Sequence, residues 1–299
     1  MQDRTNPPNP GLDGDDKEIV VVTKPVWQRL LANPTAVISV LCLMVLVLGS
    51  VFANAVAGSD PLRINPSIRF KPPSFEFPFG TDNLGRDMFK IVLHGGKTSL
   101  LVGAVVTIIS MTVATVLGLL AGYYRRVDMF LMRFVDGLMS FPAIVLATAM
   151  TGYLGPSVGT VVTSLSIVLI APSLRVVRGQ VLVVRELQMI EAARAVGVPT
   201  MRIFTKYILP AVSSPILVQA SFIFSAAILS EAALSFIGLG IGSEDISWGN
   251  ALTESRNYVS RAPWIVMFPG LALMLAILAL NLLGDALRDV LDPKLARRR

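Results

Sequence analysis

Cysteine and histidine are nearly missing from this chain, which has only Cys42 and His94. A single cysteine cannot form an intrachain disulfide or a thiolate metal cluster. A single histidine excludes the paired-histidine motifs that hold zinc. The sequence therefore predicts no metal site, and it places His94 as an ordinary loop residue.

Charge is also scarce: only 15% of the 299 residues are charged, against about 25% in a soluble domain. Hydrophobic residues make up 53%, and the mean hydropathy is +0.66. Such a composition excludes a disordered chain and argues against a soluble enzyme. The net charge of +6 would suggest nucleic acid in a soluble protein, but here we expect lipid contact and no nucleic acid. The sequence predicts an all-α integral membrane protein.

Long apolar runs give the number of membrane spans. A bilayer core of about 30 Å requires about 20 apolar residues in a helix. Six runs qualify, at residues 36–57, 98–122, about 136–154, about 157–174, 209–237 and about 263–283. The third and fourth are separated only by Gly155-Pro156, so their boundary is the weakest.

The basic residues indicate the orientation. An even number of spans places both termini on one side of the membrane. Most of the 26 lysines and arginines fall in the two terminal tails and in the loops after the second and fourth runs. Under the positive-inside rule, both termini are expected in the cytoplasm.

The loop after the fourth run is long for an inner loop, and it is patterned. Residues 178–210 read RGQVLVVRELQMIEAARAVGVPTMRIFTKYILP. Helix formers fill 180–196, Gly197 is placed to end that helix, and Thr200 is placed to cap a second, short one. From the pattern alone, this pair is either a compact knob for another protein or a basic amphipathic pair on lipid headgroups.

This loop resembles the EAA loop of ABC-importer permeases, in its Glu191-Ala192-Ala193, in Gly197 and in the closing YILP at 207–210. Other stretches are similar to the C-type inner-membrane subunit of dipeptide, oligopeptide and nickel importers. They are FGTDNLGRDMF at 79–89, TSLLVGAVV at 98–106, GLLAGYYRRVD at 118–128, ILSEAALSFIGLGI at 228–241, SWGNAL at 247–252, APWIVMFPGLAL at 262–273 and NLLGDALRDVLDPKL at 281–295. The resemblance covers about residues 30–295.

The resemblance implies a type I ABC importer permease fold with six transmembrane helices, in a bacterial cytoplasmic membrane. The implied organisation is a cytoplasmic tail at 1–30, a first transmembrane helix at 31–57, an extracytoplasmic loop at 58–97, a five-helix core at 98–285 with its coupling loop at 178–210, and a basic tail at 286–299. The implied partners are a second, distinct permease, two ATPase subunits and an extracytoplasmic substrate-binding protein.

The resemblance also implies which residues meet the ATPase. They are Glu191, Ala192, Ala193, Arg194, Gly197 and Arg202. This chain is expected to be non-catalytic and to hold no cofactor, with ATP and Mg bound by the partner ATPases. Gly96-Lys97-Thr98 imitates the end of a Walker A loop, but that loop requires glycine where Ile91 stands.

Polar residues near the membrane form a second group of candidates. Glu231 is either a gate or pathway residue, or a glutamate hydrogen-bonded to a neighbouring helix, because a carboxylate at this depth avoids lipid. Asn281 and Asp285 either line the inner exit or bond to loop residues. Arg133 and Asp136, at i and i+3, are expected to pair.

The outer loop carries Asp82, Gly85, Arg86 and Asp87, which resemble the family's GTD-x-x-GRD motif. They are expected to make a tight turn and orient the chain before the second span, or else to contact substrate.

Two other function classes also fit an all-α membrane protein. A secondary transporter predicts inverted repeats and intramembrane ionisable clusters, and a scaffold predicts spans without kinks or polar residues. The 191–210 pattern favours an importer of di- or oligopeptides over both. Within the same family, nickel chelates, glutathione and opine-type conjugates stay open as substrates.

Overall fold

The computed structural model describes residues 26–58, 60–242 and 245–291. Apart from one isolated bridge between Thr81 and Asp87, the regular structure in these residues is helical. The helices are α1 (Val26–Leu31), α2 (Pro34–Val51), α3 (Ala53–Ala57), η1 (Pro66–Ile68), α4 (Met88–Tyr123), α5 (Arg125–Met139), α6 (Ala143–Leu154), α7 (Val158–Arg185), α8 (Gln188–Ala195), α9 (Thr200–Ile203), the π-helical η2 (Phe204–Ile208), α10 (Leu209–Ile237), α11 (Trp248–Ser255), η3 (Arg256–Tyr258) and α12 (Trp264–Leu291).

Five helices are long and apolar enough to cross a membrane: α2, α4, α7, α12 and the continuous run Thr200–Ile237 that contains α10. The pair α5 and α6 makes a sixth candidate if it counts as one broken span, since the two helices are bent by 81°. The run predicted as the third span, at about 136–154, is thus divided between the end of α5 and α6. Pro142 accounts for the break, because proline disfavours the helical conformation of the residue before it.

Helices α4, α7 and α12 are longer than the hydropathy predicts. Helix α4 begins at Met88, not at 98, because the Asp87 side chain caps it by accepting from the Phe89 N–H at 2.9 Å. His94 consequently lies on a helix, where its Nε2 is 3.0 Å from the carbonyl oxygen of Gly58, and the loop prediction for it was wrong. Helix α7 continues to Arg185, so the single helix expected over 180–196 is in fact the end of α7 followed by α8.

The tails predicted at 1–30 and 286–299 fall mostly outside the described residues, although α12 continues through the start of the second one, to Leu291. Residues 155–159, at the start of α7, have the sequence pattern Gly-x-Ser-x-Gly, which is also the pattern of the nucleophile elbow in α/β-hydrolases. Here Ser157 caps the helix by accepting from the Thr160 N–H at 3.1 Å. That serine has a structural role at a helix start.

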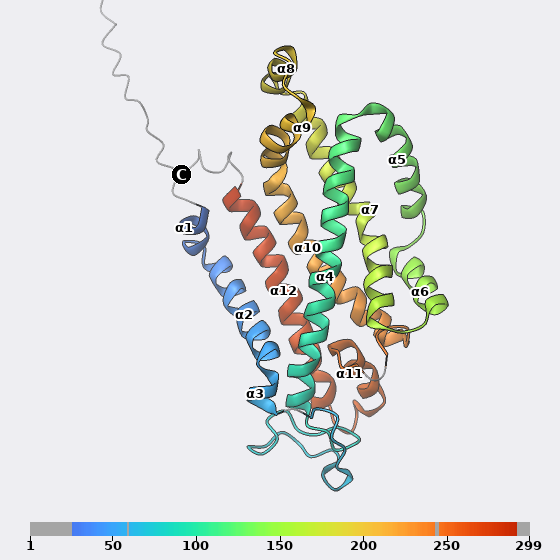
Figure 1. Ribbon diagram of the computed structural model, residues 1–299. Coiled ribbons are helices and arrows are strands. Elements are labelled where there is room, and N and C mark those ends of the chain that lie inside the picture. The colour runs from blue at the N-terminus through green and yellow to red at the C-terminus, as the bar shows by residue number, and fades with distance from the viewer. Residues whose placement is uncertain (1–25, 59, 243–244, 292–299) are drawn as a thin grey trace, which may run out of the picture.

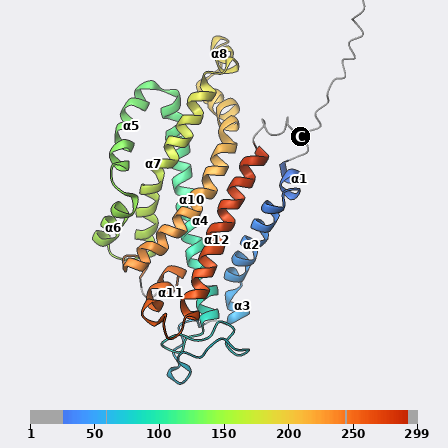
Figure 2. The ribbon, with the colours of Figure 1, turned by 180° about the vertical axis from the view of Figure 1, so that it is seen from behind.

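Helix α4 contacts α2, α7, α10 and α12, and it lies along one face of the bundle, in front in Figure 1 and behind in Figure 2. Its approach to α7 is close because it presents Gly118 and Gly122 there. A Cβ on these glycines would lie 2.8 Å from Val177 and 2.6 Å from Val181. No larger residue fits without separating the two helices.

The bundle has two ends of different character. Helix α8, the start of α1 and the last turn of α12 lie at one end, here called the inner end (Figure 1). Residues 60–87 and α11 lie at the other, here called the outer end. Each end carries one group of the candidate residues.

Candidate coupling and outer-end sites

At the inner end, α8, α9 and η2 form a knob that projects beyond the bundle (Figure 1). Gly197 makes its turn with φ +79°, a left-handed conformation that favours glycine. The turn is closed by the Gly197 N–H to the Arg194 carbonyl at 2.9 Å and the Val198 N–H to the Ala193 carbonyl at 3.0 Å. The predicted turn is therefore present. The predicted Thr200 cap is wrong, because Pro199 takes the cap position and Thr200 is already inside α9.

The knob has a buried side and an exposed side. Ile190 and Ala193, three residues apart, both point inward and pack with Ile203, Ile208 and Val212. Ala193 is only 7% exposed, so it packs within the knob and presents little surface for the contact with another protein that the resemblance implied. Glu191, Ala192, Arg194 and Arg202 are exposed.

Exposed apolar side chains surround these polar ones on the knob. They are Leu187, Met189, Val196 and Met201, and Val196 is 84% exposed. Apolar side chains gathered on a projecting element, with charged neighbours, are typical of a protein-contact surface. The sequence pattern pointed to the alanines and missed these residues, although their irregular spacing on either side of Gly197 gave little signal.

Arg194 lies over an aromatic ring rather than free in solvent. Its guanidinium carbon is 4.5 Å from the centroid of Tyr123, at the end of α4, and its Nε donates to the Tyr123 hydroxyl at 3.1 Å. The Tyr123 ring in turn meets the Phe204 ring edge-on, with centroids 4.9 Å apart. The knob is thus attached to α4 as well as to its neighbours in sequence.

The acid pairs of α5 differ from the prediction. Asp136 bonds to Arg175 of α7 and not to Arg133, which is exposed. Asp128, two turns earlier, is held by two bonds from Arg178, one of them 2.7 Å long. Both carboxylates therefore fix α5 to α7, an arrangement that only the long α7 makes possible.

At the outer end, Asp82 and Arg86 form a compact turn. The Asp82 carboxylate accepts from the backbone N–H groups of Leu84 and Arg86, each at 2.8 Å, and from the Arg86 Nε at 2.5 Å. Gly85 has φ +76°, and a Cβ there would lie 1.8 Å from the carbonyl oxygen of Asn65. Only glycine fits this position, and the predicted tight turn is present.

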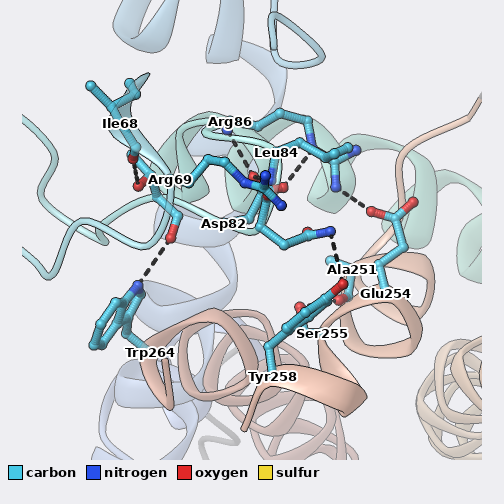
Figure 3. Close-up of polar contacts among 12 residues, drawn as sticks. Ile68, Arg69, Asp82, Leu84, Arg86, Ala251, Glu254, Ser255, Tyr258 and Trp264 are labelled. Carbon is cyan, nitrogen blue, oxygen red and sulfur yellow. Dashed lines mark hydrogen bonds and ion pairs between the residues drawn. The ribbon is translucent and has the colours of Figure 1, made fainter. Parts of the chain in front are cut away.

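The turn is fixed to α11 and to the start of α12, as Figure 3 shows. Arg86 reaches Glu254 of α11, and the Trp264 indole N–H donates to the Thr81 carbonyl at 3.2 Å. The cavity beside Arg86 and Glu254 has a volume of only about 20 Å³, room for about one water molecule. These polar groups bind one another, and the cavity beside them is too small for a peptide.

The charges at this turn are shifted by burial and by their partners. Burial lowers the pKa of Arg86, but its bonds to Glu254 and Asp82 outweigh this and raise that pKa above its ordinary value. Burial raises the pKa of Asp87, against its backbone bonds and the charge of Lys90. Arg86 therefore stays charged as the centre of the turn.

Glu231 lies inside the outer half of the bundle and is fully buried. Its carboxylate accepts from three hydroxyls: Ser99 of α4 at 3.1 Å, Ser235 of its own helix at 2.9 Å and Ser247 at 2.8 Å. Ser247 caps α11, so one carboxylate connects α4, α10 and α11. Of the two sequence interpretations, this geometry favours the hydrogen-bonded one.

The sequence did not single out the serines that bind Glu231, and it placed Trp248 at the outer membrane interface, whereas the structure buries it. The Trp248 indole N–H donates to the Val92 carbonyl at 2.8 Å, and its backbone N–H donates to Ser99 at 3.2 Å. The signal was available in SWGNAL, where Ser247 stands three residues before Asn250, as a helix cap would.

Asn281 and Asp285 lie one turn apart on α12 but in different surroundings. Asn281 is half-buried and accepts from the Ser225 hydroxyl of α10 at 2.7 Å. Asp285 is exposed at the inner end. The first connects two helices, and the second is exposed among the described residues.

The structure is thus a bundle of membrane-length helices with a projecting inner knob and a closed outer turn. The profile of the family described as "binding-protein-dependent transport system inner membrane component" matches residues 114–297, and the chain belongs to this family. The profile of the "N-terminal TM domain of oligopeptide transport permease C" matches residues 23–73, which makes the chain a C-type member.

Curated relatives match over almost the full length. A putative peptide transport system permease protein of Brucella abortus is 40% identical over 295 residues, covering 99% of both chains. The dipeptide transport system permease protein DppC of Alkalihalophilus pseudofirmus is 39% identical, covering 97% of this chain and 96% of that one. The glutathione transport system permease protein GsiD of Pectobacterium atrosepticum is 38% identical, covering 94% of each.

The family prediction and the all-α membrane fold are thereby confirmed. The chain is an inner-membrane permease component of an ABC importer, a non-catalytic subunit whose family carries no cofactor of its own. Membership in a binding-protein-dependent system implies ATPase and binding-protein partners.

Proposed function

We propose that this chain is one permease half of an importer for di- or oligopeptides. The support is the set of relatives named as peptide permeases at about 40% identity over nearly the whole chain. The second half would be a related but distinct permease, and two ATPase subunits would bind from the cytoplasm. A relative named for glutathione at 38% identity keeps peptide-like conjugates within the proposed substrate class.

The inner end is proposed to face the cytoplasm, with both termini on that side. The basic residues of α5, α7 and α8 cluster there, including Arg125, Arg126, Arg185 and Arg194, in agreement with the positive-inside rule. The outer turn at 82–87 would then face the substrate-binding protein.

The knob is proposed to be the coupling element, and this exposed surface is the observation that carries the proposal. Glu191, Ala192 and Arg202 would contact the ATPase, with Leu187, Met189, Val196 and Met201 filling apolar depressions around them. Gly197 sets the turn that presents this surface. Nucleotide-driven closure of two ATPases would move two such knobs, and the attached α10 would tilt with them.

The remaining polar residues have narrower proposed roles. Asp285, exposed at the inner end of α12, is the candidate for the exit of the pathway, with Asn281 setting the position of α12 against α10. Glu231 and the Asp82–Asp87 turn are proposed to hold the outer end in shape.

The test is a pull-down of the tagged chain from its native membrane in mild detergent, with mass spectrometry of the partners. The native chain is expected to bring ATPase subunits and a second permease. Glu191→Arg with Gly197→Pro is expected to lose the ATPases and keep the permease, because proline cannot adopt φ +79°. Lys206→Ala, an exposed cation of the same knob, is the matched control and is expected to keep both.

Two outcomes would overturn the proposal. One is a native chain recovered alone that transports solute without ATP, which would point to a secondary transporter. The other is ATPase retention by the Glu191→Arg, Gly197→Pro variant at native levels. If neither outcome occurs, uptake competition among dipeptides, longer peptides, glutathione and nickel chelates decides the substrate class.

A further inference from the structure

The coupling knob is attached to the bundle along the chain and also by side-chain contacts. Helix α8 follows α7 after the short link Glu186-Leu187, and it leads through α9 and η2 into α10. Its buried residues Ile190 and Ala193 pack in one cluster with residues of α7 and α10. It also contacts the inner end of α4, a helix that precedes it by a long stretch of sequence. Movement of the knob can therefore reach α7 and α10 through the chain and through packing, but it can reach α4 only through non-covalent contacts.

The contact with α4 comes from both sides of α8. Before it, the Arg185 guanidinium donates to the Gly122 carbonyl at 2.8 Å. At its end, Arg194 stacks on Tyr123 at 4.5 Å and donates to its hydroxyl at 3.1 Å. Two arginines thus hold adjacent residues of the last turn of α4.

The Tyr123 ring is itself fixed in place. It meets Tyr124 edge-on with centroids 5.1 Å apart, and it meets Phe204 in the same way at 4.9 Å. Phe204 begins η2, which leads into α10. A displacement of Arg194 is therefore transmitted to α4 through the Tyr123 ring, whose rotation is restricted by these two neighbours.

Helix α4 is suited to transmit such a displacement toward the outer end. It packs on α7 through Gly118 and Gly122, where a Cβ would meet Val177 and Val181. At its outer half, Ser99 joins the Glu231 contacts. One rigid helix thus runs from the knob to the buried polar contacts at the outer end.

We propose that Arg194 and Tyr123 form a clasp that makes α4 move together with α8, so that ATPase closure is transmitted through α4 as well as α10. The proposal rests on the proposed function, in which the knob docks on the ATPase. It gives Arg194 a positioning role on the chain itself, in place of the direct ATPase contact that the resemblance implied. Tyr123 is the second member of the clasp.

The experiment uses the complete importer in proteoliposomes and measures three quantities: ATPase subunits retained, ATP hydrolysed, and solute taken up per ATP. Tyr123→Ala and Arg194→Ala are each expected to retain the ATPases and to lower uptake per ATP by about two- to fivefold, the factor that corresponds to losing an exposed cation–π contact. The double variant is expected to be no worse than either single one, because both remove the same contact. Tyr123→Phe keeps the ring but loses the hydroxyl bond, so it is expected to lower uptake per ATP less than Tyr123→Ala does. The matched cation control Lys206→Ala is expected to stay near native.

A covalent rescue separates transmission from a general structural effect. Changing Cys42→Ser removes the only cysteine, so Tyr123→Cys and Arg194→Cys can be joined by a short, cleavable bis-maleimide. Joining them is expected to restore uptake per ATP, and cleaving the linker is expected to lower it again. A variant that was merely misfolded would not recover.

The outcomes distinguish this inference from the proposed function. Native uptake per ATP in Tyr123→Ala, or no recovery on joining the two cysteines, would overturn the clasp. Loss of the ATPases from Arg194→Ala but not from Tyr123→Ala would also overturn it, and would return Arg194 to the ATPase interface. Failure of the proposed function itself would appear elsewhere, as ATPase retention by Glu191→Arg with Gly197→Pro.

Discussion

The two ends of the bundle use similar residues in opposite ways. At the outer end, Glu231 is buried and accepts three hydrogen bonds, whereas Glu191 on the inner knob is exposed. Gly85 and Gly197 both have positive φ, but only Gly85 is pressed against another backbone. The outer end is held together by contacts within the chain, and the inner end leaves its groups available for other molecules. This difference suits a subunit that moves at one end while keeping its shape at the other.

Substitution of the two glutamates is expected to give the largest difference in stability between the two ends. Glu231→Ala leaves three hydroxyls at the α4–α10–α11 contact without their acceptor and is expected to cost on the order of 3 kcal/mol of stability. Glu191→Ala is expected to change stability by less than about 0.5 kcal/mol, because the side chain is exposed. Thermal unfolding of the two purified variants in detergent measures both. Equal stability losses would remove the distinction between the ends.

The two glycines provide the second test. Gly85→Ala is expected to cost about 2–3 kcal/mol, because the new Cβ is forced against the Asn65 carbonyl in addition to the strained φ. Gly197→Ala carries only the strain of its φ, since no atom lies within 4 Å of its Cβ, and is expected to cost about 1 kcal/mol. Protease accessibility of residues 60–87 should rise for the first variant alone. A larger loss from Gly197→Ala would show that the knob is packed more tightly than its exposure indicates.

A third test concerns the indole of Trp248, which joins α11 to α4. Trp248→Phe keeps most of the apolar contact but leaves the Val92 carbonyl without its donor at 2.8 Å. The expected cost is about 1–2 kcal/mol, with uptake per ATP unchanged once the importer is assembled. Stability is read from unfolding and coupling from proteoliposome uptake. A coupling defect in a stable variant would mean that the outer end also takes part in transmission.

The smallest expected effect is at the cap of α4. Asp87→Ala is expected to cost about 1 kcal/mol, and Asp87→Asn almost nothing, because asparagine caps a helix equally well. Burial raises the pKa of Asp87, so the folded protein holds its proton more tightly than the unfolded chain does. Stability should therefore fall slightly as the pH rises from the ordinary carboxyl pKa through the raised one, and Asp87→Asn should remove that slope. A native slope of the opposite sign would contradict the assignment.

Much of the fold could be predicted because hydropathy reports membrane depth directly. The run at 209–237 corresponds to α10, the run at 36–57 is covered by α2 and α3, and the run at 263–283 lies within the longer α12. The errors fall where polar groups extend a helix beyond the apolar run. Hydropathy does not register that Asp87 caps α4 or that arginines on α7 reach Asp128 and Asp136.

The positions of the candidate sites could be predicted from the sequence, but the side-chain contacts within them could not. The turn at Gly197 and the turn at Gly85 follow from glycine and its neighbours. Which alanine of the knob faces inward, and that Arg194 stacks on Tyr123, depend on how helices distant in sequence are packed. Local pattern carries no information on such long-range contacts, and the hydroxyl partners of Glu231 escaped for the same reason.

The most direct test of the account is a cross-link from the knob to its partner. In a Cys42→Ser chain with a single new cysteine at Ala192, a thiol cross-linker applied to native membranes is expected to capture an ATPase subunit, and ATP is expected to change the yield. A cysteine at Phe75, exposed at the outer end, is the matched position and is expected to capture no ATPase. Capture of the ATPase from position 75 and not from 192, or labelling of position 192 in intact cells by a membrane-impermeant thiol reagent, would contradict the assignment of the knob as the coupling element.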